Sequence, residues 1–197
     1  MDKIKKTIKT YEQIANSYEE RYKDINLIKH LIDFFIQNLK GKKVLDIGCG
    51  PGRDAEYLSK YGLNVKGIDL TPSFIQMASK NVPKAKFILM YMRKLEFSRN
   101  SFDGIWACAS FLHIPKAEAK KTLLGFRKVL KPEGILGISV KEGLGEKFKE
   151  YKDKKRFISF YTQKEFKNLV ESCNFKIIKT GKEKKEDTWL HVFATKD

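Results

Sequence analysis

The sequence predicts an α/β fold: a doubly wound, mostly parallel sheet of seven strands, with an antiparallel hairpin at its C-terminal end and helices at its N-terminal end. Two observations and one general rule lead to this prediction. Short apolar runs alternate with amphipathic stretches between Lys43 and Val140, as strands alternate with helices in a parallel sheet. Right-handed crossovers place such helices on both faces of the sheet. Near the C-terminus, a charged turn joins the last two apolar runs, which indicates a hairpin.

The first 40 residues are expected to form a helical lid on a single domain that spans residues 1–197. Helical spacing begins at Thr7, and a second helix begins near Ile25 and stops at Gly41. The first helix is indicated by the recurrence of Ile8, Tyr11, Ile14, Ala15, Tyr18 and Tyr22.

The central part of the chain predicts strands and helices in alternation. The expected strands are Val44–Ile47, Asn64–Ile68, Lys86–Met90, Phe102–Ala107 and Ile135–Val140. The expected helices are Asp54–Tyr61, Pro72–Asn81 and Lys116–Leu130, the last of which is closed by Lys131-Pro132-Glu133-Gly134. Pro72 suits the first turn of its helix, where proline loses no hydrogen bond.

The C-terminal part predicts one helix and two strands. The stretch Lys141–Arg156 is rich in glycine and charge, so we expect a loop or a short helix there, and residues 141–161 are expected to face the substrate. Thr162 and Glu165 predict a capping box for a helix over Thr162–Cys173. Strands are expected at Phe175–Thr180 and Trp189–Thr195, joined by the turn Lys182–Asp187.

The chain is strongly basic, with 40 Lys and Arg against 24 Asp and Glu and a formal net charge of +16. Such a surface attracts phosphates. Only six of the 40 basic residues are arginine, however, and arginine is the residue that base and phosphate recognition favours. The lysines are spread along the whole chain, which indicates a bias of composition. A nucleic-acid partner is therefore not favoured by the charge.

Neither a membrane span nor a metal site is expected. No apolar run reaches the roughly 20 residues that a membrane span needs. The basic N-terminus lacks the apolar stretch of a signal peptide, so we expect a cytoplasmic protein. The three cysteines, Cys49, Cys108 and Cys173, form no C-x-x-C pair, and each is interpreted as a small buried side chain.

The first expected strand ends in the glycine-rich turn Gly48-Cys49-Gly50-Pro51-Gly52. Glycine permits positive φ and leaves room for a ligand beside the backbone. The dinucleotide pattern G-x-G-x-x-G fails here because Arg53 stands at its third glycine. Asp46, two residues before the first glycine, suits a ligand that carries a cationic amine.

A second acidic residue stands at the end of the second expected strand. Asp69 follows Gly50 by 19 residues, a spacing at which a carboxylate can accept hydrogen bonds from both hydroxyls of a ribose. The turn, this acid and the alternation of strands with helices together indicate a site for an adenosine-containing cofactor.

Four segments resemble motifs of the class I S-adenosylmethionine (SAM)-dependent methyltransferases. Val44–Gly52 is similar to their motif I, and Gly67-Ile68-Asp69 to their acidic motif. Ser101–Ala107 and Phe126–Gly134 resemble their "S-F-D" and "R-V-L-K-P-G-G" segments. The likeness covers residues 43–140 well. It extends more loosely to Tyr11–Tyr18, which is similar to the "Y-x-x-I-A-x-x-Y" of small members, and to parts of the tail.

The resemblance implies SAM as cofactor, S-adenosylhomocysteine (SAH) as product and a role for each matching residue. Asp46 and the turn, including Gly48, Cys49, Gly50 and Gly52, would hold the methionine end. Asp69 would hold the ribose, and Leu70 would pack on the adenine. The remaining cofactor contacts implied are Ala107, which would border the methionine, and Tyr18, which would close over the cofactor.

One departure from the family pattern concerns the adenine. Relatives commonly carry an acid after the third strand, whereas this chain has Tyr91 followed by Met92 and Arg93. Tyr91 could contact the adenine, or main-chain groups of Met92 and Arg93 could do so instead. The alternative is that Tyr91 simply packs against its neighbours.

His113 is the candidate general base. It follows the fourth expected strand, where the active site of an open α/β sheet lies. Its usual pKa near 6.5 suits proton exchange at neutral pH. The alternative is that His113 shapes the loop or caps the next helix. Tyr161 and His191 are candidates for the substrate pocket, and His30 is interpreted as a surface helix residue.

The expected activity is transfer of a methyl group (EC 2.1.1.-) to an O or N atom of a small-molecule acceptor. The N/D-P-P-Y/F motif of many nucleic-acid amino-methylating enzymes is absent after the fourth strand, and Cys108 lacks the preceding proline of the cytosine-C5 enzymes. Two alternatives stay open: an RNA- or protein-modifying methyltransferase that uses the lysine-rich surface, and a SAM-binding protein without catalysis.

Overall fold

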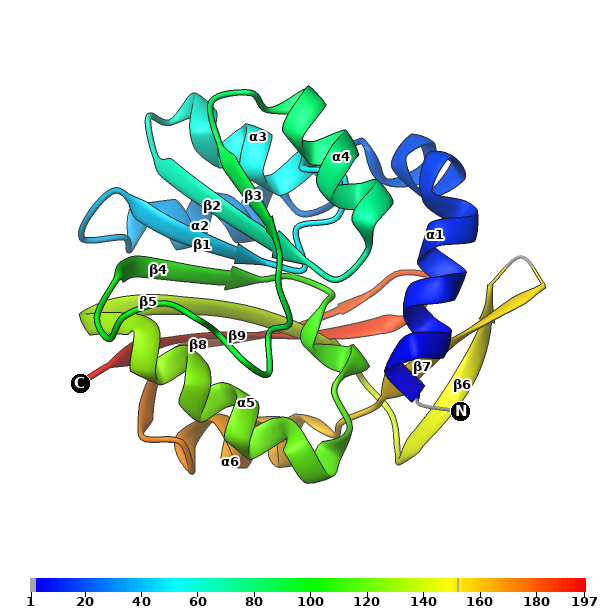
Figure 1. The fold of residues 1–197 in the computed structure, drawn as a ribbon. Coiled ribbons are helices and arrows are strands. Elements are labelled where there is room, and N and C mark those ends of the chain that lie inside the picture. The colour runs from blue at the N-terminus through cyan, green and yellow to red at the C-terminus, as the bar shows by residue number, and fades with distance from the viewer. Residues whose placement is uncertain (1–2, 152) are drawn as a thin grey trace.

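The computed structural model describes residues 3–151 and 153–197 and confirms the predicted fold class (Figure 1). The main sheet consists of β1 (Lys43–Ile47), β2 (Asn64–Asp69), β3 (Lys86–Leu89), β4 (Phe102–Ala107), β5 (Leu130–Lys141), β8 (Phe175–Lys184) and β9 (Thr188–Lys196). The strand order is β3-β2-β1-β4-β5-β9-β8. Strands β1 to β5 are parallel, and β9 is antiparallel to both of its neighbours.

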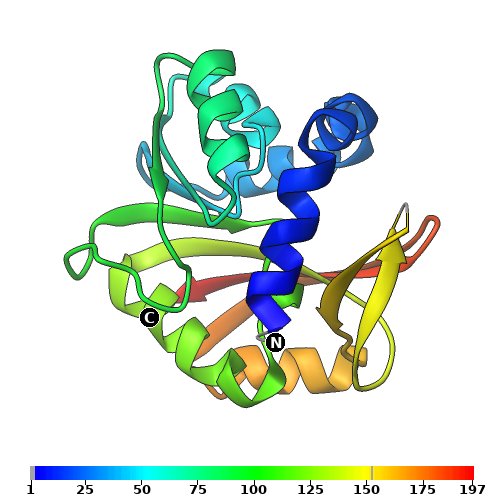
Figure 2. The ribbon, with the colours of Figure 1, turned by 45° about the vertical axis from the view of Figure 1, so that its right-hand side comes forward.

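Helices cover both faces of the sheet (Figure 1). On one face lie α2 (Lys29–Gln37), α3 (Arg53–Lys60) and α4 (Pro72–Asn81), and on the other lie α5 (Lys116–Val129) and α6 (Gln163–Glu171). The first helix, α1 (Lys3–Tyr22), covers neither face: it crosses the edge where the parallel strands end (Figure 2). This position follows from its contacts, which are with α4 and with the later hairpin.

The alternation of side chains along β1 divides the core into two layers. Leu45 and Ile47 pack toward α5 and α6, whereas Val44 packs toward α2 and α3. All three side chains are fully buried. The same strand therefore supports both layers, and its carboxyl end brings Asp46 and the glycine-rich turn to the open edge of the sheet.

The expectation of a loop or short helix over Lys141–Arg156 is wrong. The chain forms a second, two-stranded sheet of β6 (Glu146–Tyr151) and β7 (Lys154–Ser159); Lys152, between them, lies outside the described residues. Phe148 and Phe157 face each other across this hairpin at 5.9 Å between ring centroids. α1 binds along the edge of β7, where the Phe157 amide donates to Thr7 Oγ1 at 3.0 Å.

Other element boundaries differ by a few residues. α1 begins at Lys3 rather than at Thr7, and a 3₁₀ turn, Ile25–Leu27, precedes α2. β5 begins at Leu130 because Leu130 pairs with Phe102 before the register shifts. The charged turn of the last hairpin shortens to residues 185–187. The capping box is confirmed: the Glu165 amide donates to Thr162 Oγ1 at 3.1 Å.

The structure predicts a large difference between two glycine substitutions. Gly48 and Gly62 have nearly the same φ, +71° and +72°, but an added Cβ would lie 2.3 Å from Ser110 Cβ at Gly48 and would meet nothing within 4 Å at Gly62. Gly62→Ala should cost about 1–2 kcal/mol of unfolding free energy from the backbone alone. Gly48→Ala should cost about 1–3 kcal/mol more through overpacking. Urea unfolding followed by circular dichroism measures both, and equal losses would contradict the packing argument.

Candidate functional site

The glycine-rich turn takes its shape from three glycines at alternate positions, all with φ in the left-handed region. Gly48, Gly50 and Gly52 have φ of +71°, +53° and +95°. The amides of Gly48 and Cys49 both donate to the Ile68 carbonyl, at 2.7 and 3.0 Å, which fixes the turn to β2. A Cβ on Gly50 would meet nothing within 4 Å, so this residue opens onto the cavity beside it.

Asp46 is a buried carboxylate whose charge is incompletely met. Its side chain is 2% exposed, and its Oδ2 has no hydrogen-bond partner in the described part of the chain. Burial raises the pKa of Asp46 well above its usual value, and the nearby Asp54 and Asp69 raise it further. Buried carboxylates without partners are costly, so this position fits a ligand that brings a cationic amine.

Asp69, at the end of β2, is held in a fixed orientation. Its Oδ2 accepts from the Gly50 amide at 3.1 Å and its Oδ1 from the Thr71 amide at 2.8 Å. Burial raises the pKa of Asp69, and these two amides lower it. Each carboxylate oxygen has a second lone pair, so both can still accept a hydrogen bond from a ribose hydroxyl.

A cavity of about 100 Å³ lies beside Asp69. Its walls come from the loops after β2, β3 and β4 and from α1, and they include the predicted residues Leu70, Tyr91 and Met92. Tyr91 Oη accepts from Arg93 Nη1 at 2.9 Å, and the guanidinium lies 5.0 Å from the Tyr91 ring centroid. Arg93 in turn forms an ion pair with Glu118. Tyr91 is therefore a fixed part of this wall.

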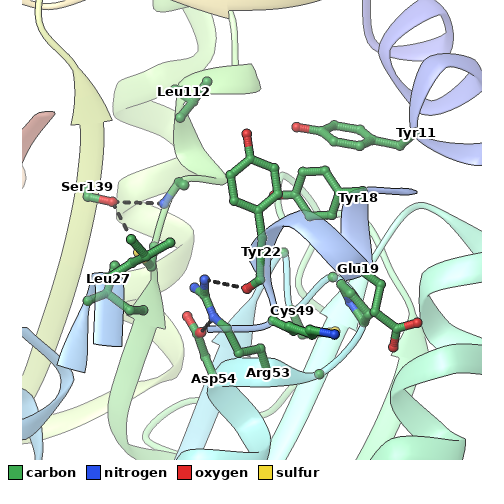
Figure 3. A pocket seen from close by; sticks show the side chains of 18 of the residues that line it. Tyr11, Tyr18, Glu19, Tyr22, Leu27, Cys49, Arg53, Asp54, Leu112 and Ser139 are labelled. Carbon is green, nitrogen blue, oxygen red and sulfur yellow. Dashed lines mark hydrogen bonds and ion pairs between the residues drawn. The ribbon is translucent and has the colours of Figure 1, made fainter. Parts of the chain in front are cut away.

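A larger cavity, of about 270 Å³, lies on the other side of the glycine-rich turn (Figure 3). Tyr18 and Tyr22 of α1 reach into it, and Leu112, after β4, and Ser139, on β5, border it on the opposite side. Ser139 Oγ accepts from the Ala109 amide at 2.8 Å and so fixes the loop after β4. Arg53 joins the lid to the turn, because its Nη1 donates to the Tyr22 carbonyl at 2.9 Å.

The two cavities meet along a shared wall. The residues that line both are Tyr11, Tyr18, Gly48, Gly50, Cys108, Ala109 and His113. We call this set the shared wall. It consists of two lid tyrosines, the glycine-rich turn and the loop after β4, so it joins three parts of the chain that are far apart in sequence.

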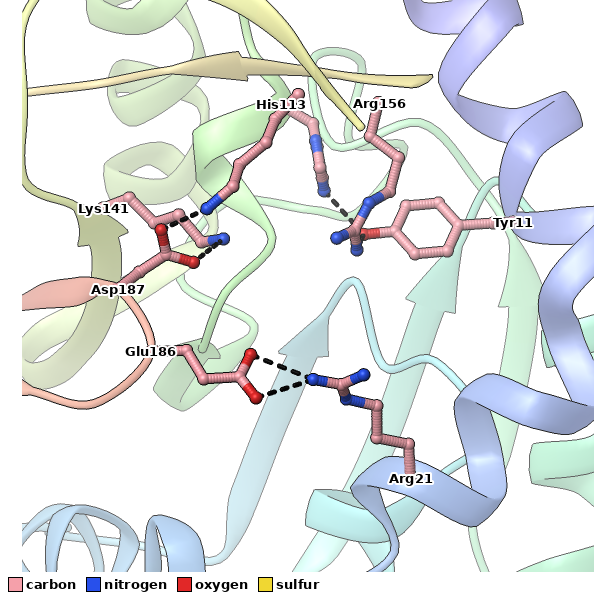
Figure 4. A network of polar contacts seen from close by, with 8 residues as sticks. Tyr11, Arg21, His113, Lys141, Arg156, Glu186 and Asp187 are labelled. Carbon is pink, nitrogen blue, oxygen red and sulfur yellow. Dashed lines mark hydrogen bonds and ion pairs between the residues drawn. The ribbon is translucent and has the colours of Figure 1, made fainter. Parts of the chain in front are cut away.

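His113 belongs to a chain of hydrogen bonds within that wall (Figure 4). Its Nδ1 lies 2.6 Å from the Phe157 carbonyl, which can only accept, so Nδ1 carries the proton. Its Nε2 then accepts from Tyr11 Oη at 2.9 Å, and Tyr11 Oη accepts from Arg156 Nη1 at 3.0 Å. Burial lowers the pKa of His113 to about 4. Both ring nitrogens are therefore engaged, and the imidazole is neutral at pH 7.

The remaining predicted residues fall in different places. Cys49, Gly52 and His191 line the larger cavity, whereas Ala107 is fully buried and its neighbours Cys108 and Ala109 line the cavity instead. Tyr161 is buried against Phe166, at 5.4 Å between ring centroids, and is not among the described residues that line either cavity. His30 is an exposed residue of α2 that pairs with Glu183.

Sequence reasoning missed three polar residues of the site: Tyr11 as a hydrogen-bonding group, Lys141 and Arg156. Tyr11 is the first tyrosine of the "Y-x-x-I-A-x-x-Y" segment, and that motif was a signal for it. Lys141 and Arg156 stand within a lysine-rich stretch that obscures them. Within the described residues, no group of three or more His, Cys, Asp or Glu could hold a metal ion.

The fold and the site together define a class of protein: a seven-stranded doubly wound sheet with a glycine-rich turn after β1 and a fixed acid after β2. Residues 44–134 match the family model described as "Methyltransferase domain". This domain belongs to the class I SAM-dependent methyltransferase superfamily, as the motifs predicted.

Relatives of known name extend the comparison. The chain is 32% identical over 146 residues to a phosphoethanolamine N-methyltransferase of Plasmodium falciparum. This match covers 70% of this chain and 54% of that protein. It is 31% identical over 152 residues to a ubiquinone biosynthesis O-methyltransferase of Actinobacillus pleuropneumoniae, with 71% and 62% covered. The chain thus spans about half the length of the first of these relatives.

A solved structure shares the fold over nearly the whole chain. It is the 1,6-didemethyltoxoflavin-N1-methyltransferase of Burkholderia thailandensis, with bound 1,6-didemethyltoxoflavin and S-adenosylhomocysteine. The TM-score is 0.79 at 21% identity, and the match covers 96% of this chain and 87% of that one.

The buried histidines predict a loss of stability in mild acid. Burial lowers the pKa of both His113 and His191 to about 4, while the unfolded chain binds these protons near pH 6.5. Their contribution is therefore present above about pH 6.5 and is lost as the pH falls toward 4. The loss for His113 should reach at most about 3 kcal/mol, at roughly 1.4 kcal/mol for each unit of pKa.

Urea unfolding at several pH values measures this loss. His113→Asn, whose amide can still donate to the Phe157 carbonyl, should flatten the decline. His30→Asn on the surface of α2 is the matched control and should leave the His113 part of the decline unchanged. An NMR titration that places the pKa of His113 near 6.5 would contradict the expectation.

Proposed function

We propose that this protein is a SAM-dependent methyltransferase that moves a methyl group to an O or N atom of a small-molecule acceptor. The observation that carries the proposal is the shared wall. One cavity fits the adenosine end of the cofactor, the larger one offers space for the methionine end and for an acceptor, and the two meet beside the glycine-rich turn. A donor and an acceptor bound on either side would come into contact there.

The residues present fit this cofactor. The unpartnered Oδ2 of Asp46 and the open side of Gly50 suit the methionine end with its cationic amine. Asp69 would accept from the ribose hydroxyls, and Leu70, Tyr91 and Met92 would surround the adenine. Cys49 and Gly52 would line the methionine side, and Tyr18 would cover it from the lid. SAM is the cofactor on these grounds, with SAH as the product.

Bound SAM supplies an activated methyl group, so the chain needs chiefly to position the acceptor and to exclude water. α1 provides the cover: Arg53 holds its C-terminal end, and Glu12 accepts from the Ser73 amide and hydroxyl at 3.0 and 2.6 Å. We assign His113 to positioning. A neutral imidazole with both nitrogens engaged fixes the orientation of Tyr11 Oη within the shared wall, and its low pKa makes it a weak base at pH 7.

The small volume of the larger cavity, about 270 Å³, favours a small acceptor over a polymer. Its roof comprises α1 and the turn between β8 and β9, which Arg21 and Glu186 join through two contacts of 2.7 and 2.9 Å. Relatives named for phosphoethanolamine and for ubiquinone biosynthesis support a small-molecule acceptor. No helix among the described residues has the length and apolar character of a membrane span. We propose a cytoplasmic location, and a nucleic-acid partner is possible but not favoured.

Removal of one buried charge should weaken the cofactor. Asp46→Asn keeps the shape of the side chain but removes the carboxylate that would meet the cationic amine, so SAH affinity should fall by at least about tenfold. Isothermal titration calorimetry measures this change. Glu171→Gln on the exposed end of α6 removes the same charge far from the turn and should leave affinity unchanged. Unchanged affinity in Asp46→Asn would show that the amine binds elsewhere.

An acceptor screen separates the proposed activity from its alternatives. Formation of SAH is followed with pools of small amines, phenols and carboxylic acids, and in parallel with total RNA and with protein extract. The expected result is turnover with a small-molecule pool. Turnover with RNA that falls steeply with added salt would instead support the polymer-modifying alternative. SAH binding without turnover on any pool would support a non-catalytic protein.

A further inference from the structure

Two cations that line the larger cavity are themselves deeply buried. Lys141, at the end of β5, has a side chain that is 9% exposed, and Arg156, on β7, is 8% exposed. Buried cations are rare unless a carboxylate or another anion meets their charge. Figure 4 shows them on opposite sides of the same space, with Arg156 next to Tyr11.

The charge of Arg156 is met only in part by the protein. Its Nη1 donates to the Tyr11 hydroxyl, which is neutral, and its Nε has no hydrogen-bond partner in the described part of the chain. Its guanidinium lies 4.3 Å from the ring centroid of Tyr151 and 5.4 Å from that of Tyr11. These aromatic contacts orient the guanidinium but supply no negative charge.

Lys141 does have an anionic partner, and that partner belongs to a turn. Asp187, between β8 and β9, accepts from Lys141 Nζ at 2.6 Å through Oδ2 and from Lys149 Nζ through Oδ1. The same turn contributes Glu186, which pairs with Arg21 of the lid. A carboxylate thus already binds at this position, and it is carried by the chain itself.

The cations share one electrostatic field. Burial is the main cause that lowers the pKa of Lys141; Asp187 raises it, and the positive charges of Lys149 and Arg156 lower it further. An anion bound beside Lys141 therefore interacts favourably with three cations. Asp187 is one carboxylate among them, so the group retains an excess of positive charge that faces the cavity.

We propose that the methyl acceptor carries an anionic group, a carboxylate or a phosphate, and that Lys141 and Arg156 bind this group in the larger cavity. Asp187 holds Lys141 in the absence of the acceptor and remains paired with Lys149 when the acceptor is bound. This inference rests on the proposed function, because it names the chemistry of the acceptor at the same site. With its anionic group bound in this way, the acceptor would direct its nucleophilic atom toward the shared wall.

A fluorescent residue in the cavity allows a direct test. Trp189 lines the larger cavity, and Lys141 Nζ lies 5.1 Å from its ring centroid, whereas the other tryptophan, Trp106, is buried in the core. Tryptophan fluorescence is recorded while inorganic phosphate, or in a second series acetate, is added at saturating SAH and constant ionic strength. We expect a saturable change with at least one of the two anions, and Trp189→Phe should abolish it.

Two charge substitutions should have opposite effects on this binding. Lys141→Met removes the cation and should lower the affinity for the anion by at least about tenfold. Asp187→Asn removes the internal competitor and should strengthen it several-fold. Lys164→Met, on the exposed side of α6, is the matched control for the loss of one positive charge and should leave binding unchanged.

The outcomes separate this inference from the proposed function. If Asp187→Asn weakens anion binding as Lys141→Met does, the pair is a structural tether and the inference is overturned. Absence of any saturable signal, or equal weakening by Lys164→Met, overturns it as well. SAH affinity is measured in the same samples by calorimetry. If the unmodified protein binds SAH but no anion, only this inference is overturned. If the unmodified protein does not bind SAH, the proposed function is overturned.

Discussion

The carboxylate of Asp54 holds together the three parts of the chain on which the site depends. Its Oδ2 accepts from the Trp106 indole of β4 and its Oδ1 from Arg53, both at 2.7 Å. Arg53 also reaches the Tyr22 carbonyl of α1. Asp54 lies in the first turn of α3, where the helix dipole favours a negative charge. One satisfied buried anion therefore fixes the glycine-rich turn against the sheet on one side and against the lid on the other.

The lid is held by polar contacts at its two ends and by aromatic contacts between them. The ring centroids of Tyr11 and Tyr18 lie 5.6 and 5.3 Å from that of Phe74 on α4, so α4 supports the helix that covers the site. At the N-terminal end, Thr7 and Thr10 bond to β7, the strand that also carries Arg156. The hairpin β6–β7 thus has two roles: it carries a cation into the larger cavity and it anchors the lid above that cavity.

The sequence supported prediction best where a local pattern has one structural solution. The boundaries of α4 and β4 and the capping box at Thr162 follow from proline, alternation and a short side-chain motif, and the structure has them as predicted. The hairpin β6–β7 could not be predicted in this way, because the outer edge of β7 is held by distant partners, namely Thr7 and Thr10. Likewise, nothing local to His113 shows that its two nitrogens meet Phe157 and Tyr11, which lie 44 and 102 residues away along the chain.

α1 forms a wall of both cavities, and this affects how their ligands can leave. Glu12 binds the first turn of α4, directly after the segment that carries Asp69. A displacement of α1 would therefore loosen the adenosine side and uncover the acceptor side in one movement. Departure of the spent cofactor and of the methylated product would then share a single conformational step.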